Sequence, residues 1–277
     1  MPPVFFVNKM DEAQAYFQAA LTDLSEKFSV IFVPVAFPIG SGEEFQGIVN
    51  LMDMKAYTAP GSGGGKESAT AIPEDVQDQV NEAREQLVES AAEGDDELLT
   101  KFLEEETLTE EEIRRGLTEG LQNNKIVPVL CGSALQNSGI TTFLDILSEA
   151  APSPQGVSET AVDGEGNETE VPVGTDGQFS GFCFKTSIDQ FSGKLSFVKA
   201  VTGTLDAETE LYNAREGKKE RTPKIYTSVG KKLEEMNALS AGDIGVLTKV
   251  TSARTNDTFC TPENTGLQYK QLDLPQP

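Results

Sequence analysis

The sequence predicts a partial doubly wound α/β sheet that carries an inserted α+β subdomain and is followed by an all-β barrel. First, short apolar runs alternate with amphipathic helical patterns in residues 1–40 and again in 122–154, which is typical of a parallel sheet covered by helices. Second, a strongly acidic insertion, residues 41–121, separates these two parts. Third, the hydrophobic period changes to two in residues 178–262, with glycines at short intervals, which indicates short antiparallel strands.

The α/β part is predicted to contain three strands and two helices. The apolar run 4–7 suits a buried parallel strand, and the helical spacing of apolar residues over 15–28 predicts an amphipathic helix. Residues 30–35 predict a second strand. After the insertion, residues 126–130 predict a third strand, and the last helix ends before the Pro152-Ser153-Pro154 breaker.

The insertion concentrates the negative charge. Residues 73–119 hold 17 acidic and 4 basic side chains, so more than half of the chain's net charge of −23 lies there. Apolar residues at steps of three and four predict a helix that begins after Pro73, and Thr109 followed by Glu112 is a capping box that predicts another. The acidic faces are either solvated helix surfaces or a docking surface, and the sequence leaves both open.

Two polar segments are predicted to be linkers. Residues 155–177 would join the α/β part to the barrel, and residues 263–277 would lead to a further domain that the sequence does not contain.

Composition excludes several kinds of site and partner. The 277 residues suffice for about two domains, and the absence of histidine excludes Ser-His-Asp and Cys-His catalysis and histidine-ligated metals. The three cysteines show neither zinc nor disulfide spacing. The net charge argues against DNA binding. With no apolar run longer than ten residues and no signal peptide pattern, we expect no membrane partner and a cytoplasmic location.

The motif Asn8-Lys9-Met10-Asp11 follows the first predicted strand, where an open α/β sheet binds ligands. Its residue types suit guanine: a carboxylate at Asp11 can accept from both the ring N–H and the exocyclic amine, whereas adenine offers a lone pair at the ring position. Lys9 can lay its methylene stem over the base, and Asn8 has a donor and an acceptor to tie the loop to the base and to a second loop.

A second loop, Cys131-Gly132-Ser133-Ala134-Leu135, follows the run 126–130 and so opens at the same sheet edge. Its backbone N–H groups can donate to the base oxygen, and the small Ala134 permits close approach. Two ordinary loops with a buried asparagine are the alternative.

The glycine-rich stretch 63–68 resembles a phosphate-binding loop but has Pro60 where a glycine is needed and Glu67 directly after the lysine. The sequence therefore predicts a guanine-reading half-site without its phosphate half.

These residues resemble the fourth and fifth guanine-nucleotide motifs of translational GTPases. Asn8 and Ser133 lie 125 positions apart in the sequence. A separation this large between the two motifs resembles that of the elongation factor G family, which carries its G′ insertion at this point. The stretches 38–49, 87–93, 108–113 and 125–134 are similar to the same family, and 191–197 and 240–244 resemble its domain II.

The resemblance implies a ribosome-associated GTPase that acts in translocation or recycling, with GTP or GDP and Mg²⁺ bound by the full-length protein. This chain would be an internal part without the phosphate loop and switches. We therefore expect no catalytic residue, no metal ligand, no tightly bound nucleotide and no GTP hydrolysis by the chain alone. The residues that the resemblance assigns to guanine binding are Asn8, Lys9, Asp11, Ser133, Ala134 and Leu135.

The same resemblance implies that domain II contacts small-subunit RNA and that the acidic insertion faces the ribosomal stalk proteins. The candidate RNA-facing hairpin, at 215–232, contains seven basic residues, although an ordinary solvated hairpin would look the same. They are Arg215, Lys218, Lys219, Arg221, Lys224, Lys231 and Lys232.

The chain also departs from the family pattern. Glu12 stands where arginine is usual, Leu135 where phenylalanine is common, and residues 206–209 replace a usual glycine-aspartate turn. These changes leave open whether the chain comes from the main factor of the family or from a diverged copy of it. Two other readings remain: another translational GTPase of release or ribosomal-protection type, and a naturally short, non-enzymatic ribosome- or stalk-binding protein.

Overall fold

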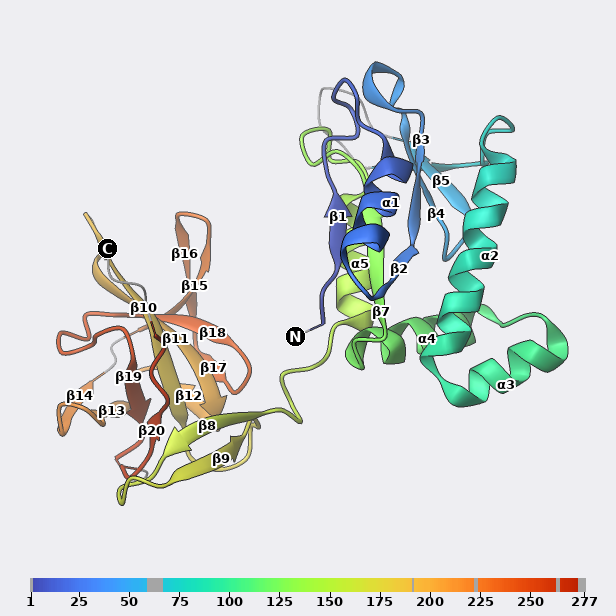
Figure 1. Cartoon of the computed structure of the whole chain (residues 1–277). Helices are drawn as coiled ribbons and strands as arrows, with labels where there is room; N and C mark the ends of the chain where they lie inside the picture. Colours follow the sequence, from blue (N-terminus) through green and yellow to red (C-terminus); the bar gives the residue numbers. More distant parts are fainter. Residues whose placement is uncertain (1, 59–66, 191, 222–223, 263–264, 274–277) are drawn as a thin grey trace. The chain divides into compact units, whose positions relative to one another are not determined.

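The computed structural model describes residues 2–58, 67–190, 192–221, 224–262 and 265–273. These residues form two compact units, Met1–Pro152 and Ser153–Pro277 (Figure 1).

Unit 1 is built on a parallel three-stranded sheet in the order β1-β7-β2, made of β1 (Phe5–Val7), β7 (Ile126–Cys131) and β2 (Ile31–Pro34). The central strand β7 is buried at all six positions, as its continuous apolar run predicts. The helices α1 (Phe17–Lys27) and α5 (Ile140–Ala150) follow β1 and β7 along the chain. The predicted α/β class is confirmed.

An antiparallel meander follows β2 directly. Its order is β3-β4-β5-β6, with β3 (Ala36–Ile39), β4 (Gly47–Asn50), β5 (Lys55–Thr58) and β6 (Ser68–Thr70). One residue, Val35, separates the two sheets: its N–H donates to Val129 of β7 and its carbonyl accepts from Leu51. The antiparallel sheet therefore begins inside the segment that the sequence pattern assigned to the α/β part. A short 3₁₀ turn (Gly42–Glu44) lies between β3 and β4.

The rest of the insertion is helical, with α2 (Gln77–Gly94), α3 (Asp96–Glu105) and α4 (Glu110–Gln122). The capping box is present in both directions: Thr109 Oγ1 accepts from the Glu112 N–H, and the Glu112 carboxylate accepts from the Thr109 N–H. Helix α3, which the apolar spacing did not separate from α2, begins at Asp96 and is capped by Asp95, whose side chain accepts from two N–H groups of the first turn.

Glycine allows α2 and α4 to touch through their backbones. A Cβ atom on Gly116 would lie 2.0 Å from the carbonyl oxygen of Ala91. The contact buries Val80, Leu87 and Ile113 completely. The acidic side chains of α2 are exposed, as the periodicity predicts, whereas Asp95, between α2 and α3, is buried.

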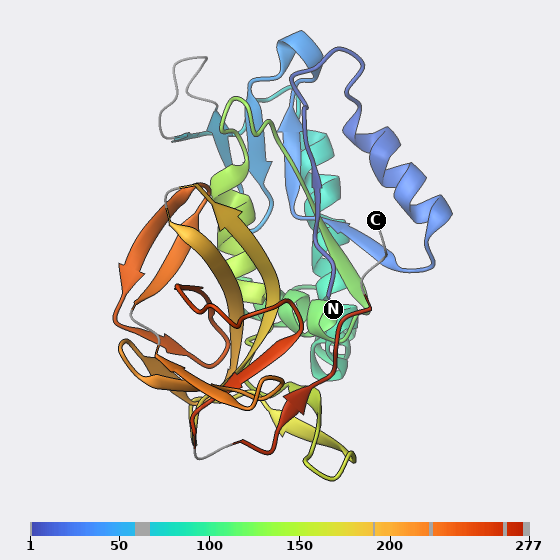
Figure 2. The same ribbon diagram turned by 90° about the vertical axis from the view of Figure 1, so that its left-hand side faces the viewer.

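Unit 2 is dominated by an eight-stranded antiparallel sheet in the order β14-β13-β19-β10-β11-β18-β15-β16, which curves around an apolar core (Figure 2). Its strands are β10 (Ser180–Asp189), β11 (Gly193–Thr202), β13 (Glu210–Asn213), β14 (Lys218–Arg221), β15 (Ile225–Val229), β16 (Lys232–Met236), β18 (Ile244–Thr248) and β19 (Asp257–Cys260). A separate pair joins β12 (Thr204–Asp206) to β17 (Ala238–Ser240). The predicted all-β architecture is confirmed.

The two polar segments predicted as linkers contain strands. Residues 155–177 contain the hairpin β8 (Ser158–Val162) and β9 (Glu168–Pro172), and β20 (Gln268–Tyr269) pairs with β8. Tyr269 is buried, and its hydroxyl lies 2.5 Å from Ser180 Oγ. Composition could not show this pairing, because it joins two short polar strands more than 100 residues apart.

No helix in the described part of the chain is long and apolar enough to cross a membrane.

Candidate functional site

The two predicted base-reading loops open at the same edge of the parallel sheet. Val7, the last residue of β1, pairs with Cys131, the last residue of β7. Beyond this pair the Gly132 N–H donates to the Val7 carbonyl and the Met10 N–H donates to the Gly132 carbonyl, both at 3.1 Å. The loops are therefore joined by backbone hydrogen bonds before any side chain is considered.

Asn8 links the loops through its side chain. Its Oδ1 accepts from the Ala134 N–H at 2.9 Å, so the structure brings together these two predicted residues. The next residue, Lys9, has a left-handed φ of 63°, which turns the chain sharply. Met10 is 1% exposed, and its carbonyl accepts from the Gly42 N–H at 2.9 Å. The buried Met10 thus anchors the loop while Asn8 and Lys9 stay exposed.

Asp11 is half-buried on the same loop. Its Oδ2 accepts one long hydrogen bond, 3.4 Å, from Nε2 of Gln136. Gln136 also donates its backbone N–H to Oγ of the buried Ser133 at 3.2 Å. The sequence reasoning missed Gln136. The sequence signal that could have indicated this contact is Ser133, because a serine hydroxyl often accepts from a nearby backbone N–H in a turn.

The second loop is closed by a narrow neck. Ser133 and Ser138 exchange backbone hydrogen bonds of 3.0 and 2.9 Å. A Cβ atom on Gly132 would lie 2.1 Å from the Ser138 carbonyl oxygen, and one on Gly139 would lie 2.4 Å from that of Cys131. Only glycine fits at these two positions. Between them Ala134 is exposed and Leu135 is 90% exposed, so the loop presents its tip outward.

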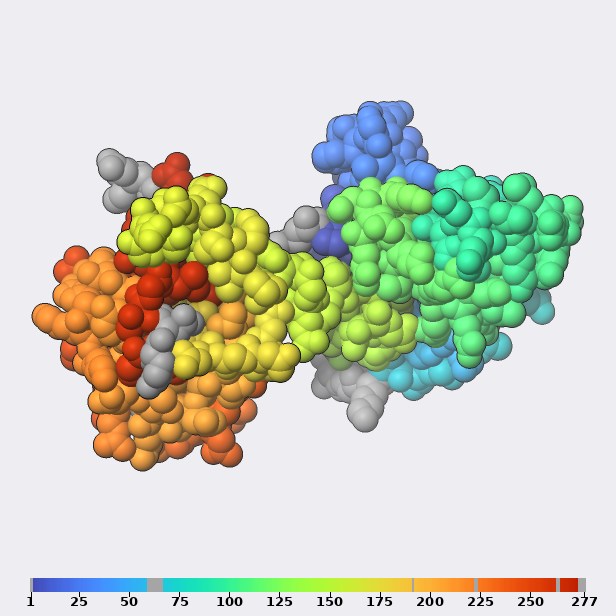
Figure 3. Space-filling view, turned by 90° about the horizontal axis from the view of Figure 1, so that it is seen from below, coloured from blue at the N-terminus to red at the C-terminus, as the bar shows by residue number. Residues whose placement is uncertain are grey.

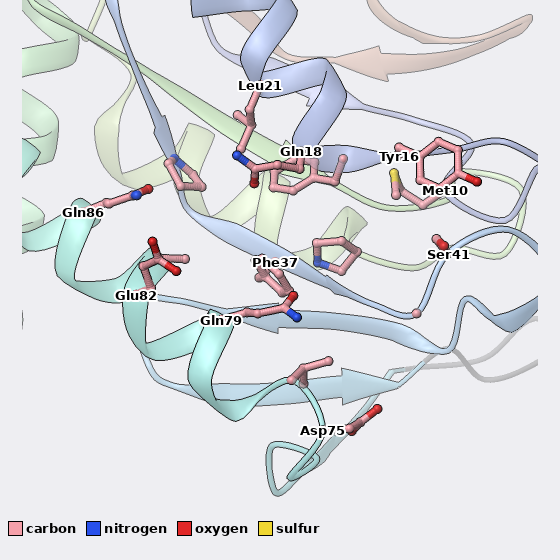
Figure 4. A pocket seen from close by; sticks show the side chains of 16 residues that line it. Met10, Tyr16, Gln18, Leu21, Phe37, Ser41, Asp75, Gln79, Glu82 and Gln86 are labelled. Carbon is pink, nitrogen blue, oxygen red and sulfur yellow. The ribbon is translucent and has the colours of Figure 1, made fainter.

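A hollow of about 610 Å³ lies beside Met10, between α1 and α2 (Figure 4). Phe37 lies in its floor, with Gln79 and Glu82 of α2 on one side. Asp11 is not among its lining residues. The hollow is therefore distinct from the edge where the predicted base-reading side chains lie.

The phosphate-like stretch lies mostly outside the described residues, because residues 63–66 do; Glu67 and Ser68 are described. Within the described ranges, no group of three or more Cys, Asp or Glu side chains is placed to hold a metal ion.

The prediction that residues 215–232 form a single hairpin is wrong. Strand β14 pairs with β13, whereas β15 pairs with β16, and these pairs lie at opposite ends of the sheet order (Figure 1). A proline at position 223, which cannot donate to a ladder, was the sequence signal for a break.

Arg215 is tied into the fold rather than displayed. Its guanidinium donates to Asp257 at 2.6 and 3.0 Å and to the Ser252 carbonyl at 3.1 Å. Asp257 is 1% exposed. Burial opposes ionisation of Asp257, but hydrogen bonds from Arg215 and Asn213 outweigh it and hold the pKa of Asp257 below its usual range.

The other basic residues lie on exposed strands and turns, and most pair with a glutamate. The pairs are Lys218–Glu216, Lys219–Glu210, Arg221–Glu208, Lys224–Glu235 and Lys232–Glu234. Lys231 is exposed in the turn between β15 and β16. Alternating opposite charges weaken the positive field that the composition of 215–232 suggests.

The acidic insertion has its own exposed apolar residues. On α3, Leu103 is 75% exposed and Leu99 is 36% exposed. The surface of α3 and α4 is seen in green in Figure 3. Between α3 and α4 the Lys101 ammonium donates to Glu112 at 2.7 Å. This bond and those from Thr109 lower the pKa of Glu112 to about 2.

Comparisons with known proteins give one family for each unit. The model of the elongation factor Tu GTP-binding domain matches residues 1–153, and the model of elongation factor G domain 2 matches residues 178–262. A crystal structure of a protein from Thermus thermophilus matches with a TM-score of 0.76 and 23% sequence identity, over 100% of this chain and 37% of that one. At this identity the likeness shows the fold alone. The chain thus spans little more than a third of that solved chain.

Proposed function

The chain belongs to the elongation factor Tu GTP-binding domain family and is elongation-factor-G-like; from this premise we propose that its 8–11 and 132–139 loops read the guanine base of GTP and GDP. The observation that carries the proposal is the 2.9 Å bond from the Ala134 N–H to Asn8 Oδ1. It joins the loops at the edge where Asp11 stands.

Each residue would have one task in base recognition. The Asp11 carboxylate would accept from the ring N–H and the exocyclic amine of guanine, displacing its long bond to Gln136. The exposed Lys9 would cover one face of the ring with its methylene stem. The Ala134 N–H is already bound to Asn8, so we assign the base oxygen to the N–H of Leu135.

In the whole protein, this base site would serve a GTPase that acts on the ribosome in translocation or recycling. We propose that the phosphates and Mg²⁺ are held by residues other than these and that the chain alone does not hydrolyse GTP. The expected cytoplasmic location belongs to the same proposal.

The test is a titration of the ¹⁵N-labelled chain with GDP and, as control, ADP, each with Mg²⁺. We expect selective shifts of the Asn8, Asp11 and Ala134 amides with GDP, with a Kd no tighter than about 1 mM, because phosphate contacts are missing. Equal shifts with ADP would contradict base reading. Micromolar affinity would mean that this chain holds a phosphate site.

The proposed partners are small-subunit RNA for unit 2 and stalk proteins for the acidic insertion. The support is the outward acidic face of the insertion with the exposed Leu99 and Leu103. Co-sedimentation of the chain with ribosomes that carry or lack their stalk proteins tests the second partner. We expect the chain to bind less to ribosomes that lack the stalk proteins. We also expect the Leu103→Ala variant to bind less than the unsubstituted chain to ribosomes that carry them.

A further inference from the structure

The neck of the second base-reading loop is held from outside by the insertion. Oε1 of Glu67, the residue before β6, accepts from the Gly139 N–H at 2.6 Å. The two residues are 72 positions apart in the sequence, and no motif at either position indicates the contact. Gly139 is buried and directly precedes α5, an 11-residue helix without a side-chain cap of its own.

The contact is electrostatically favourable for Gly139 but incomplete for its partner. A carboxylate at a helix N-terminus is stabilised by the helix dipole, and a charge-assisted hydrogen bond is stronger than a neutral one. However, Glu67 Oε2 and the Ser138 hydroxyl are buried without a hydrogen-bond partner among the described residues. A buried carboxylate oxygen left in this way costs stability. Stability alone therefore does not explain why Glu67 lies there.

The position of Gly139 determines that of the loop tip. Gly139 packs against the Cys131 carbonyl and Gly132, and the exchange of hydrogen bonds between Ser133 and Ser138 closes the loop one residue further on. A shift of the Gly139 backbone is thus transmitted to Ser133 and from there to Ala134, which is bound to Asn8. The short distances along this path allow its residues little independent movement.

Strand β6, which directly follows Glu67, lies at the edge of its sheet. Strand β6 pairs only with β5 among the described strands, and its three residues are exposed. In the sheet β3-β4-β5-β6 it is the last strand, so among the described strands one ladder alone fixes its position.

From these observations we propose that Glu67 is a positioning residue that couples the insertion to guanine recognition: its bond to Gly139 holds the 133–138 loop where the base is read. The proposal rests on the proposed function of that loop. Displacement of β6 would break the bond and weaken guanine binding without altering any residue that contacts the base.

The test compares Glu67→Ala and Glu67→Gln with Glu74→Ala, which removes an exposed carboxylate of the same insertion. The first readout is hydrogen exchange of the Gly139 amide, with the amides of β2 and β4 in the same unit as internal reference for folding. We expect exchange about 10-fold or more faster in Glu67→Ala, because a bond to a charged acceptor is lost. In Glu67→Gln the amide oxygen still accepts, and exchange should stay within about threefold of the unsubstituted chain.

The second readout is the GDP titration followed by the Ala134 and Asn8 amides. We expect about a threefold or larger rise in Kd for Glu67→Ala, rescue by Glu67→Gln and no change for Glu74→Ala. Unchanged Gly139 exchange and unchanged GDP affinity in Glu67→Ala would overturn the inference. Absence of GDP-selective shifts in the unsubstituted chain would instead overturn the proposed function, while Gly139 exchange would still decide whether Glu67 holds the loop.

Discussion

The base-reading loops of unit 1 and the basic strands of unit 2 use polar side chains in opposite ways. In the loops, backbone hydrogen bonds among Val7, Met10 and Gly132 and the bond from Ala134 to Asn8 hold the fold, whereas the Asp11 carboxylate accepts a long bond of 3.4 Å from Gln136. In the basic strands the charged groups themselves are paired, most of them with glutamates of the same sheet. Asp11 can serve a ligand because other groups hold its loop, whereas most of the basic side chains are already paired with glutamates.

The largest effect is expected at Arg215, where a charged side chain holds the fold. Removing it in Arg215→Ala would leave the Asp257 carboxylate, 1% exposed, without its main partner, and loss of one member of a buried pair typically costs about 3 kcal/mol or more. We expect the unfolding free energy of unit 2 to fall by about that amount in urea denaturation. Lys218→Ala, on the neighbouring exposed strand, is the matched control and should leave it unchanged.

The Arg215 effect should also depend on pH. The pKa of Asp257 is held below its usual value of 3.8, so its contribution is present above about pH 4 and disappears as the pH falls through the lowered pKa. The difference between the unsubstituted chain and Arg215→Ala should therefore shrink in acid. A difference that is constant from about pH 7 to about pH 3 would argue against the pairing.

The next largest effect is expected at Asp11, where the side chain serves the ligand. In Asp11→Asn an amide donor replaces one acceptor, which suits xanthine better than guanine. We expect preference to shift from GDP to xanthosine diphosphate by about 10-fold or more, as for loss of a bond to a charged group. The stability of unit 1 should change little. Unchanged base preference in nucleotide titrations would refute the assignment of Asp11.

A smaller effect is expected at Asn8, which serves both the fold and the ligand. Asn8→Ala removes the acceptor of the Ala134 N–H, a loss of about 1 kcal/mol. We expect about fivefold weaker GDP binding and faster exchange of the Ala134 amide. Glu12→Ala, exposed on the same loop, is the control. Weaker binding with unchanged Ala134 exchange would mean that Asn8 acts on the base alone.

What the sequence could predict depends on whether a contact follows from a local pattern or joins distant segments. The edge where Asn8 and Ala134 meet follows from two apolar runs and the rule that parallel strands end together, so local pattern suffices. The contacts of Glu67 with Gly139 and of β8 with β20 join short polar segments far apart, which periodicity cannot detect. The short strands β3 to β6 escaped notice because three or four residues carry little alternation.

The smallest effect is expected from the exposed cations, and it tests whether either edge of unit 2 meets RNA. We compare Gln substitution of Lys218, Lys219 and Arg221 on β14 with Gln substitution of Lys224, Lys231 and Lys232 around β15 and β16. These sets lie at opposite ends of the sheet order, so an RNA that contacts one need not contact the other.

If one set faces RNA, its removal should weaken binding to a small-subunit RNA fragment. It should also lower the slope of log affinity against log salt by somewhat less than about 0.7 to 0.9 per residue, because glutamates already offset part of the charge. The other set should have no effect. Equal effects of both sets would indicate attraction by general charge alone. The pairing of cations with glutamates is consistent only with a modest, one-sided change, because a surface that neutralises itself can orient RNA at a few positions but cannot attract it from a distance.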